Sequence, residues 1–295
     1  MTIGICGTGR MGAAMAERLI DEGQSVAVWN RNAARAAPLV EKGAALAVSP
    51  AALMGQCDIV IVMVFDEAAQ KDVYQGIDGL LTASKATLIV DMSTMLPDTA
   101  RALAALVRNA GFEFLECPVG GTVAPAKAGK LLGMAGGEDE AFGRAKPVLE
   151  LLCRRVEHVG PVGSGAAMKL AVNLPLATYW ESLGEAMSLA LAGGVDAELA
   201  GSMMADSSGA IGVAGPRIPM ILAAIGAQPD APGSFDIAGM AKDLKLMQAW
   251  AAQNNCAVPL AEAAGQAYRS AADQGWADND AAVMAAWRCR QNREA

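Results

Sequence analysis

Short apolar runs alternate with amphipathic stretches over the first 160 residues of the chain. The runs are apolar or β-branched throughout, as in parallel strands that are buried on both faces of a sheet. The predicted strands are Thr2–Cys6, Ser25–Trp29, Asp58–Phe65, Thr87–Met92 and Phe112–Glu116, with Leu131–Ala135 and Arg155–Val159 as further candidates. Helical patterns separate them at Met11–Glu22, Asn32–Lys42 and Pro97–Ala110. This βαβαβ order predicts a doubly wound, mostly parallel sheet of the Rossmann type.

The pattern changes after residue 160 and becomes helical to the end of the chain. One long helix is predicted from Gly163 to about Gly193, which Pro175 either kinks or interrupts with an early turn. Its polar residues Lys169, Asn173, Glu181 and Glu185 fall on or near one stripe. A loop rich in Gly and Pro breaks the later helices at about 226–233. We therefore expect an α/β domain at 1–162 and an all-α domain at 163–295.

Composition narrows the class of protein. A net charge of −8 and a pI near 4.8 argue against a nucleic-acid partner. No uncharged apolar run reaches membrane-spanning length and the N-terminus does not resemble a signal peptide, so we expect a cytoplasmic protein. The six cysteines form no CxxC pair and are expected to be buried and reduced. His158 is the only histidine, which excludes a Ser-His-Asp triad and a histidine-rich metal site; we expect no metal.

A glycine-rich turn follows the first predicted strand and opens the first helix. Its residues are Gly7, Thr8, Gly9, Arg10, Met11 and Gly12. In a GxGxxG turn the first glycine permits the bend, the second lets a pyrophosphate approach the backbone, and the third lets helix and strand pack closely. A lone GxGxxG is weak evidence, but the flanking strands and helix stand at the expected distances. The turn predicts dinucleotide binding; the alternative is that the glycines only form a turn.

The end of the second predicted strand indicates which dinucleotide binds. NAD enzymes usually carry Asp or Glu there, to bind the ribose 2′-hydroxyl. This chain has Asn30, Arg31 and Asn32 instead, with Arg35 one helical turn further on. A guanidinium group pairs well with a 2′-phosphate, so NADP is favoured over NAD. The alternative is that Arg31 is merely a solvated surface arginine.

Further motifs along the whole chain resemble the β-hydroxyacid dehydrogenases, the family of 3-hydroxyisobutyrate dehydrogenase, whose NAD-binding domain is similar to that of 6-phosphogluconate dehydrogenase. The motifs are Asp91-Met92-Ser93-Thr94, Glu116-Cys117-Pro118-Val119-Gly120-Gly121-Thr122, Pro125-Ala126 with Gly129, Gly163-Ser164-Gly165, Met168-Lys169-Leu170-Ala171-Val172-Asn173 and Lys242-Asp243-Leu244. Within the family, three of the blocks are most similar to the glyoxylate/succinic semialdehyde reductase branch: Trp29-Asn30-Arg31, Pro125-Ala126 and Lys169-Leu170-Ala171-Val172-Asn173. The resemblance implies a nicotinamide-dependent oxidoreductase that acts on a small hydroxy acid or its semialdehyde.

The resemblance also implies roles for particular residues. Those expected to contact the cofactor, besides the glycine turn and Asn30–Arg35, are Met63, Val64, Thr94 and Lys242. Those expected to hold the substrate carboxylate are Ser93, Gly120, Gly121 and Thr122. Lys169 would be catalytic, and Asn173 would orient the substrate oxygen. Two positions depart from the family pattern: Gly120 replaces a serine, which leaves the substrate open, and Asn32 replaces a threonine, which affects only 2′-phosphate binding.

The chemistry of the Lys169 and Asn173 pair agrees with these roles. The two residues are four positions apart, so both project from one face of a helix. Carbonyl reduction needs a proton donor for the developing alkoxide, and the reverse reaction needs the same lysine as a base with a lowered pKa. Asn173 would add a neutral hydrogen bond to the same oxygen. In isolation such a pair is usually plain helix surface, but its neighbours along the chain are apolar.

Two other functions fit parts of the sequence. An imine reductase of related architecture typically replaces the lysine, which this chain retains as Lys169. A non-catalytic NADP-binding protein would keep the glycine turn and Arg31 but would have no need for Lys169 with Asn173. A decarboxylating sugar-acid dehydrogenase would need a longer helical domain. The resemblance and the apolar helical half favour a homodimer or homotetramer.

Overall fold

A computed structural model describes residues 1–85, 87–227, 233 and 235–294. The chain forms two compact units, Met1–Lys169 and Leu170–Ala295, which divide within helix α8. The sequence placed the boundary seven residues earlier, at 162/163, and the assignment of cofactor and substrate roles to two domains stays a prediction. No described helix is long and apolar enough to cross a membrane.

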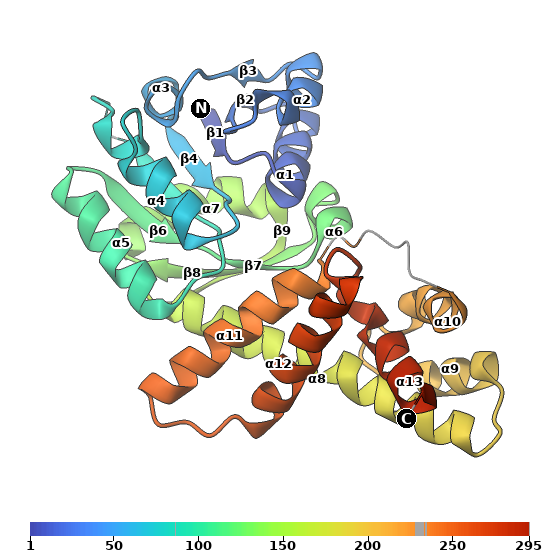
Figure 1. The fold of residues 1–295 in the computed structure, drawn as a ribbon. Helices are drawn as coiled ribbons and strands as arrows, with labels where there is room; N and C mark the ends of the chain where they lie inside the picture. Colours follow the sequence, from blue (N-terminus) through green and yellow to red (C-terminus); the bar gives the residue numbers. More distant parts are fainter. Residues whose placement is uncertain (86, 228–232, 234, 295) are drawn as a thin grey trace. The chain divides into compact units, whose positions relative to one another are not determined.

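The described residues of the first unit form a nine-stranded sheet in the order β3-β2-β1-β4-β5-β6-β8-β7, with β9 paired to β8 (Figure 1). The strands are β1 Thr2–Cys6, β2 Ser25–Trp29, β3 Ala45–Leu46, β4 Ile59–Val62, β5 Leu88–Asp91, β6 Glu113–Glu116, β7 Val119–Gly120, β8 Leu131–Gly137 and β9 Cys153–Gly160. The first six strands pair in parallel, and β8 runs antiparallel to β6 and β7. This confirms the Rossmann-type, mostly parallel sheet.

Helices cover both faces of this sheet. They are α1 Arg10–Asp21, α2 Ala37–Glu41, α3 Pro50–Gln56, α4 Glu67–Gln75, α5 Pro97–Asn109, α6 Val123–Lys127 and α7 Asp139–Leu152. Because side chains alternate along a strand, Ile59 and Ile61 pack with the core under α1 and α7, while Val60 and Val62 pack with the core under α3, α4 and α5. The apolar runs of the sequence are therefore buried on both faces, as predicted.

The second unit is helical and has its own core. It consists of the later part of α8 Ser164–Ala192 with α9 Ala197–Asp206, α10 Ile218–Gly226, α11 Ile237–Gln253, α12 Pro259–Ala271 and α13 Met284–Glu294. Its core includes Trp180, Tyr268 and Trp287. Pro175 lies inside α8 without ending it. Glu185 is exposed, whereas Lys169, Asn173 and Glu181 on the same helix are buried, so the predicted polar stripe ends before Glu185.

Several predicted elements need correction. The predicted helix Asn32–Lys42 is confirmed only in part, because it is divided in two. A 3₁₀ turn, η1 Ala33–Arg35, follows Asn32, whose side chain accepts a bond from Ala34 N–H, and α2 then covers Ala37–Glu41 with Pro38 in its first turn. The predicted strand Asp58–Phe65 is shorter, because Asp66 caps α4 and leaves Phe65 exposed. Five cysteines are buried, but Cys256 is exposed. Of the predicted loop 226–233, residues 228–232 lie outside the described part of the chain.

Candidate functional site

The glycine turn joins β1 to α1. Gly7 has φ +102°, and a Cβ on it would lie 2.3 Å from the Met63 carbonyl oxygen. A Cβ on Gly12 would lie 1.9 Å from the Gly7 carbonyl oxygen. Both positions therefore require glycine for the packing of the turn itself. A Cβ on Gly9 would meet no described atom within 4 Å, so Gly9 borders open space at the start of α1.

The start of α1 has the features of an anion site. No side chain caps its first turn, and its N-cap residue is Gly9. The hydroxyl oxygen of Thr8 is buried and has no hydrogen-bond partner among the described residues. Unpaired N–H groups and the helix dipole at such a terminus attract phosphate. The open space beside Gly9 and the orphaned hydroxyl of Thr8 both fit a bound dinucleotide.

The residues after β2 divide into two kinds. The Asn30 carboxamide oxygen accepts a bond of 3.0 Å from Thr8 N–H, and its NH₂ group donates a bond of 2.9 Å to the Asn32 carbonyl. Asn32 caps the following 3₁₀ turn. Arg31 and Arg35 are exposed at the same end of the strand. Asn30 therefore braces the glycine turn, and the two arginines are cationic side chains exposed at this end of the strand.

The carboxyl ends of β4 and β5 are joined through Ser93. Its hydroxyl oxygen accepts a bond of 3.1 Å from Val64 N–H, and its own N–H donates a bond of 2.8 Å to Asp91 Oδ1. Ser93 is buried, whereas Met63, Val64 and Thr94 are partly exposed beside it. These predicted site residues therefore gather at one edge of the sheet, next to the glycine turn.

Asp91 is the centre of a buried hydrogen-bond network that the sequence did not reveal. Its Oδ2 accepts bonds from the Tyr74 hydroxyl at 2.9 Å and from Gln70 Nε2 at 3.1 Å. Burial raises the pKa of the Asp91 carboxyl, and it also raises the pKa of Tyr74, with Asp91 as the second cause. Asp91 lay within the predicted strand Thr87–Met92, but nothing in the spacing of Gln70 and Tyr74 indicated this contact.

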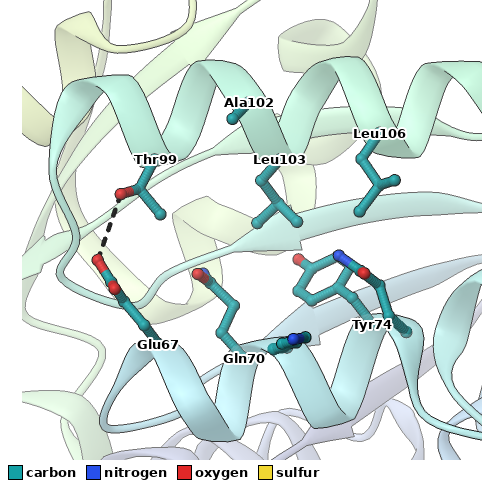
Figure 2. A pocket seen from close by; sticks show the side chains of 9 residues that line it. Glu67, Gln70, Tyr74, Thr99, Ala102, Leu103 and Leu106 are labelled. Atoms are coloured by element: carbon teal, nitrogen blue, oxygen red, sulfur yellow. Dashed lines mark hydrogen bonds between the residues drawn. The ribbon is translucent and has the colours of Figure 1, made fainter.

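Gln70 and Tyr74 also line a groove of about 480 Å³ between α4 and α5 (Figure 2). Its α5 wall is formed largely by Ala102, Leu103 and Leu106, and Glu67 accepts a bond from Thr99 at one end. None of the site residues predicted from the sequence lines this groove. The groove is therefore separate from the site that the motifs define.

The loop predicted to hold a carboxylate contains two glycines in different surroundings. Gly121 has φ +118°, and a Cβ on it would lie 2.8 Å from Leu131 Cδ2, so the fold requires glycine there. A Cβ on Gly120 would come no closer than 3.6 Å to Leu132, an ordinary contact. Thr122 precedes α6 and makes no capping bond with its side chain. The fold therefore does not explain glycine at 120.

A buried carboxylate lies at the carboxyl end of β6. Glu116 Oε1 accepts bonds from Gly163 N–H at 2.6 Å and Gly165 N–H at 2.8 Å, at the start of α8. Burial raises the pKa of Glu116 to about 7, although these backbone bonds oppose the shift. The sequence placed Glu116 in a motif but gave it no role, because the bonded glycines are 47 and 49 positions away.

Lys169 and Asn173 both lie on α8 and are almost fully buried, at 7% and 4% exposure. The Asn173 NH₂ group donates a bond of 2.8 Å to Asp243 Oδ2, which is also buried. Lys242 Nζ lies 3.2 Å from the other oxygen of Asp243. In the second unit the structure therefore brings together Asn173, Lys242 and Asp243, of which Asp243 had no primary role in the sequence prediction.

The glycine turn of the α/β unit is typical of dinucleotide-binding proteins, and comparison with known proteins gives the class and the family. Residues 2–160 match the NAD-binding domain of 6-phosphogluconate dehydrogenase. Residues 163–287 match the NAD-binding domain of NADP-dependent 3-hydroxyisobutyrate dehydrogenase. The chain belongs to the β-hydroxyacid dehydrogenase family, which confirms the resemblance and the expected enzyme class, that of nicotinamide-dependent dehydrogenases acting on CH–OH groups.

Individual relatives match over nearly the whole chain. A NAD-dependent L-serine dehydrogenase of Pseudomonas aeruginosa is 35% identical over 286 residues, 96% of each chain. Glyoxylate/succinic semialdehyde reductase 2 of Arabidopsis thaliana is 31% identical, over 100% of this chain and 82% of the relative. The structure of a 3-hydroxyisobutyrate dehydrogenase from Salmonella typhimurium has a TM-score of 0.86 at 25% identity, covering 97% of this chain and 99% of that one.

Imine reductases are more distant in structure. The enzyme from Myxococcus stipitatus has a TM-score of 0.64 at 22% identity, and the match covers 96% of this chain and 98% of that one. At this identity the likeness shows a shared fold alone. The dehydrogenase relatives therefore fit the chain better than the imine reductase alternative does.

Proposed function

We propose that this protein is an NADP-preferring reductase and dehydrogenase that interconverts a small 3-hydroxy acid, or a similar hydroxy acid, and its semialdehyde or keto acid. The observation that carries the proposal is the buried pair of Lys169 and Asn173 on α8, with Asn173 held by Asp243. Burying a polar group costs free energy even when hydrogen bonds offset part of it, and burial in general favours the neutral form of a lysine, as a general base requires.

The chain's own residues would act as follows. The N-terminus of α1, with Thr8, binds the pyrophosphate, and Arg31 with Arg35 binds the 2′-phosphate. When bound, the cofactor supplies or accepts the hydride. Lys169 gives a proton to the carbonyl oxygen in reduction and takes it back from the hydroxyl in oxidation. Asn173 would donate a neutral hydrogen bond to the same oxygen, and its bond to Asp243 sets the orientation of its carboxamide.

The remaining predicted residues would contact the substrate carboxylate or the nicotinamide half of the cofactor. Ser93 and the loop Gly120–Thr122 offer hydroxyl and backbone N–H donors to a carboxylate. Met63, Val64, Thr94 and Lys242 are assigned to the cofactor. The position of Ser93 and Thr94 beside the glycine turn, at the carboxyl ends of β4 and β5, supports this assignment, since ligands of such sheets bind there.

Steady-state assays test this function. NADPH oxidation is measured with glyoxylate, succinic semialdehyde and a panel of other small aldehydes and keto acids, and NADP reduction is measured with 3-hydroxyisobutyrate and L-serine. We expect turnover of at least one carboxylate-bearing substrate, with NADPH preferred over NADH. Turnover of cyclic imines alone would instead identify an imine reductase, and NADPH binding without any turnover would identify a non-catalytic protein.

We also propose a cytoplasmic homodimer or homotetramer. Large apolar side chains are exposed on the second unit at the end of α8 and along α9; they include Leu189 at 77%, Leu199 at 53% and Met203 at 65%. Such a surface favours association with a second copy. The free thiols fit a reducing compartment. Light scattering at micromolar concentration should give at least twice the chain mass, and a monomer mass would contradict the proposal.

A further inference from the structure

Glu116 makes an unusual contact with the helix that carries Lys169. The first N–H groups of a helix have no partner within the helix and are usually satisfied by a Ser, Thr, Asp or Asn just before it. Before α8 that position is Gly163, which has no side chain. Glu116 reaches across from the end of β6 instead, and one oxygen accepts both Gly163 N–H and Gly165 N–H.

The surrounding residues leave room for this contact. A Cβ on Gly136, in the neighbouring strand β8, would lie 2.3 Å from Glu116 Oε1. A Cβ on Gly165 would lie 2.4 Å from the Met134 carbonyl oxygen and 3.2 Å from Glu116 Oε1. Any other residue at either position would push the carboxylate or the helix away. Both glycines therefore permit the close approach of α8 to the sheet.

The contact buries a carboxyl group at a cost in free energy. Glu116 is fully buried, and its second oxygen, Oε2, has no hydrogen-bond partner among the described residues. Asp91 pairs with Glu116 in the β5–β6 register, and repulsion from its negative charge also raises the pKa of Glu116. The neighbouring thiol of Cys117 is buried as well, and its pKa is raised. The N-terminus of α8 is the positive feature that Glu116 contacts, through these backbone N–H groups.

We propose that Glu116 is a positioning residue that fixes the first turn of α8 on the sheet and thereby sets the place of the Lys169 ammonium group. Gly165 and Lys169 are four positions apart, so Lys169 lies on the same face, about 6 Å further along the helix. A shift of the first turn is passed on to Lys169 because the helix between them is unbroken. The inference rests on the proposed role of Lys169 as the proton-transfer residue.

A double-mutant cycle tests the inference. Glu116→Asp keeps the charge but is one methylene shorter, so the carboxylate cannot hold both N–H groups. We expect kcat to fall about 10-fold or more, since a misplacement of about 1 Å costs up to about 10²-fold. In the Lys169→Ala background the same change should alter kcat by less than about twofold, because the group that it positions is gone. An equal loss in both backgrounds, or no loss with Lys169 present, overturns the proposal.

A second measurement separates positioning from simple loss of folded enzyme. Slower proton transfer should raise the solvent deuterium isotope effect on kcat in Glu116→Asp, with the NADPH dissociation constant within about twofold of wild type. A smaller folded fraction lowers kcat but leaves the isotope effect unchanged, and that result contradicts positioning. Glu113→Asp, on the same strand but exposed, is the matched control and should change neither quantity.

Two further variants, Glu116→Gln and Lys169→Ala, complete the test. If Glu116→Asp does not fold, Glu116→Gln keeps the side-chain length and one acceptor oxygen, and it should show the same dependence on Lys169 with a smaller loss. Lys169→Ala alone tests the proposed function. A wild-type rate in Lys169→Ala overturns the proposed function. A large loss in Lys169→Ala, together with wild-type activity in Glu116→Asp and Glu116→Gln, overturns only the positioning role of Glu116.

Discussion

Asn173 and Asp243, which are 70 positions apart, are joined by a hydrogen bond of 2.8 Å between two almost fully buried side chains. The bond fixes which way the Asn173 carboxamide faces, because the acceptor must be opposite its NH₂ group. Lys242 Nζ lies 3.2 Å from the second oxygen of Asp243 and balances its charge. The Asp243 carboxylate therefore links Lys242, which was predicted to contact the cofactor, to Asn173, which was predicted to contact the substrate.

Lys169→Ala should lower kcat by about 10²–10⁴-fold, the usual contribution of a general acid–base group. The NADPH dissociation constant should stay within about twofold, because the glycine turn and Arg31 are untouched. The thermal midpoint should change little or rise, since a buried cation no longer has to be desolvated. Added methylamine should restore part of the rate. A variant that keeps more than about a tenth of kcat, with chemistry rate-limiting, rules out the assignment and makes Asp243 the next candidate.

Asp243→Ala should destabilise the fold and slow the reaction through Asn173. Removing the acceptor leaves a buried NH₂ group without its bond, at a cost of about 1–3 kcal/mol in unfolding free energy. Asn173→Ala should lower kcat by less than Lys169→Ala does, because a neutral donor supplies only part of the alkoxide stabilisation. Urea unfolding and steady-state kinetics measure both effects. Strictly additive losses in kcat for the Asn173→Ala, Asp243→Ala double variant would show that the two residues act separately.

Arg31→Ala should reduce the preference for NADPH. A charge-assisted bond to a 2′-phosphate is worth about 1.5–3 kcal/mol, so NADPH should bind about 10–100-fold more weakly while NADH binding is unchanged. Titration calorimetry with both cofactors measures this. Arg154→Ala, an exposed arginine on β9, is the control and should change neither affinity. Equal affinity of the wild-type protein for NADPH and NADH contradicts the predicted preference.

Gly120→Ser and Gly121→Ser should have different effects on the thermal midpoint and on KM, although the two residues are adjacent. The first change places a Cβ at an ordinary contact distance, so the thermal midpoint should hold while KM for the carboxylate substrate changes. The second forces a φ of +118° on serine and a contact of 2.8 Å with Leu131, which should cost at least about 1 kcal/mol. Scanning calorimetry with kinetics distinguishes them. Equal thermal midpoints for the two variants would show that the loop adjusts more easily than its packing indicates.

Glu116 should make stability depend on pH. Burial raises its pKa from 4.5 to about 7, so the folded state binds more protons than the unfolded state between these values. The free energy of unfolding contributed by this group is therefore greatest below pH 4.5 and falls as the pH rises through 7, by about 3 kcal/mol at most. The difference between wild type and Glu116→Gln, measured by urea unfolding at pH 5, 6, 7 and 8, should follow this fall. A constant difference contradicts it.

Local patterns determined much of the first unit. The strands β1, β2 and β5 follow from continuous apolar runs, and the glycine turn follows from three glycines whose spacing only a tight βα turn explains. The predicted helix Asn32–Lys42 is divided because the Asn32 side chain caps a 3₁₀ turn and Pro38 favours the first turn of a new helix. Pro175 was expected to kink α8 or to interrupt it with an early turn, but α8 continues from Ser164 to Ala192 through this position.

By itself, the sequence determined that Lys169 and Asn173 share a helix face wherever that helix lies, and their role in catalysis stays a prediction. Only the tertiary structure decided what each polar group contacts. Asn173 donates a hydrogen bond to Asp243, which is 70 positions away in the sequence. Gly163 donates one to Glu116 over 47 positions, and Tyr74 donates one to Asp91 over 17 positions. Such contacts depend on how strands order themselves in a sheet and how helices pack. Periodicity describes only neighbouring residues, so it does not predict contacts between residues far apart in the sequence. The hydrogen-bond partners of the buried carboxylates are therefore known only from the tertiary structure.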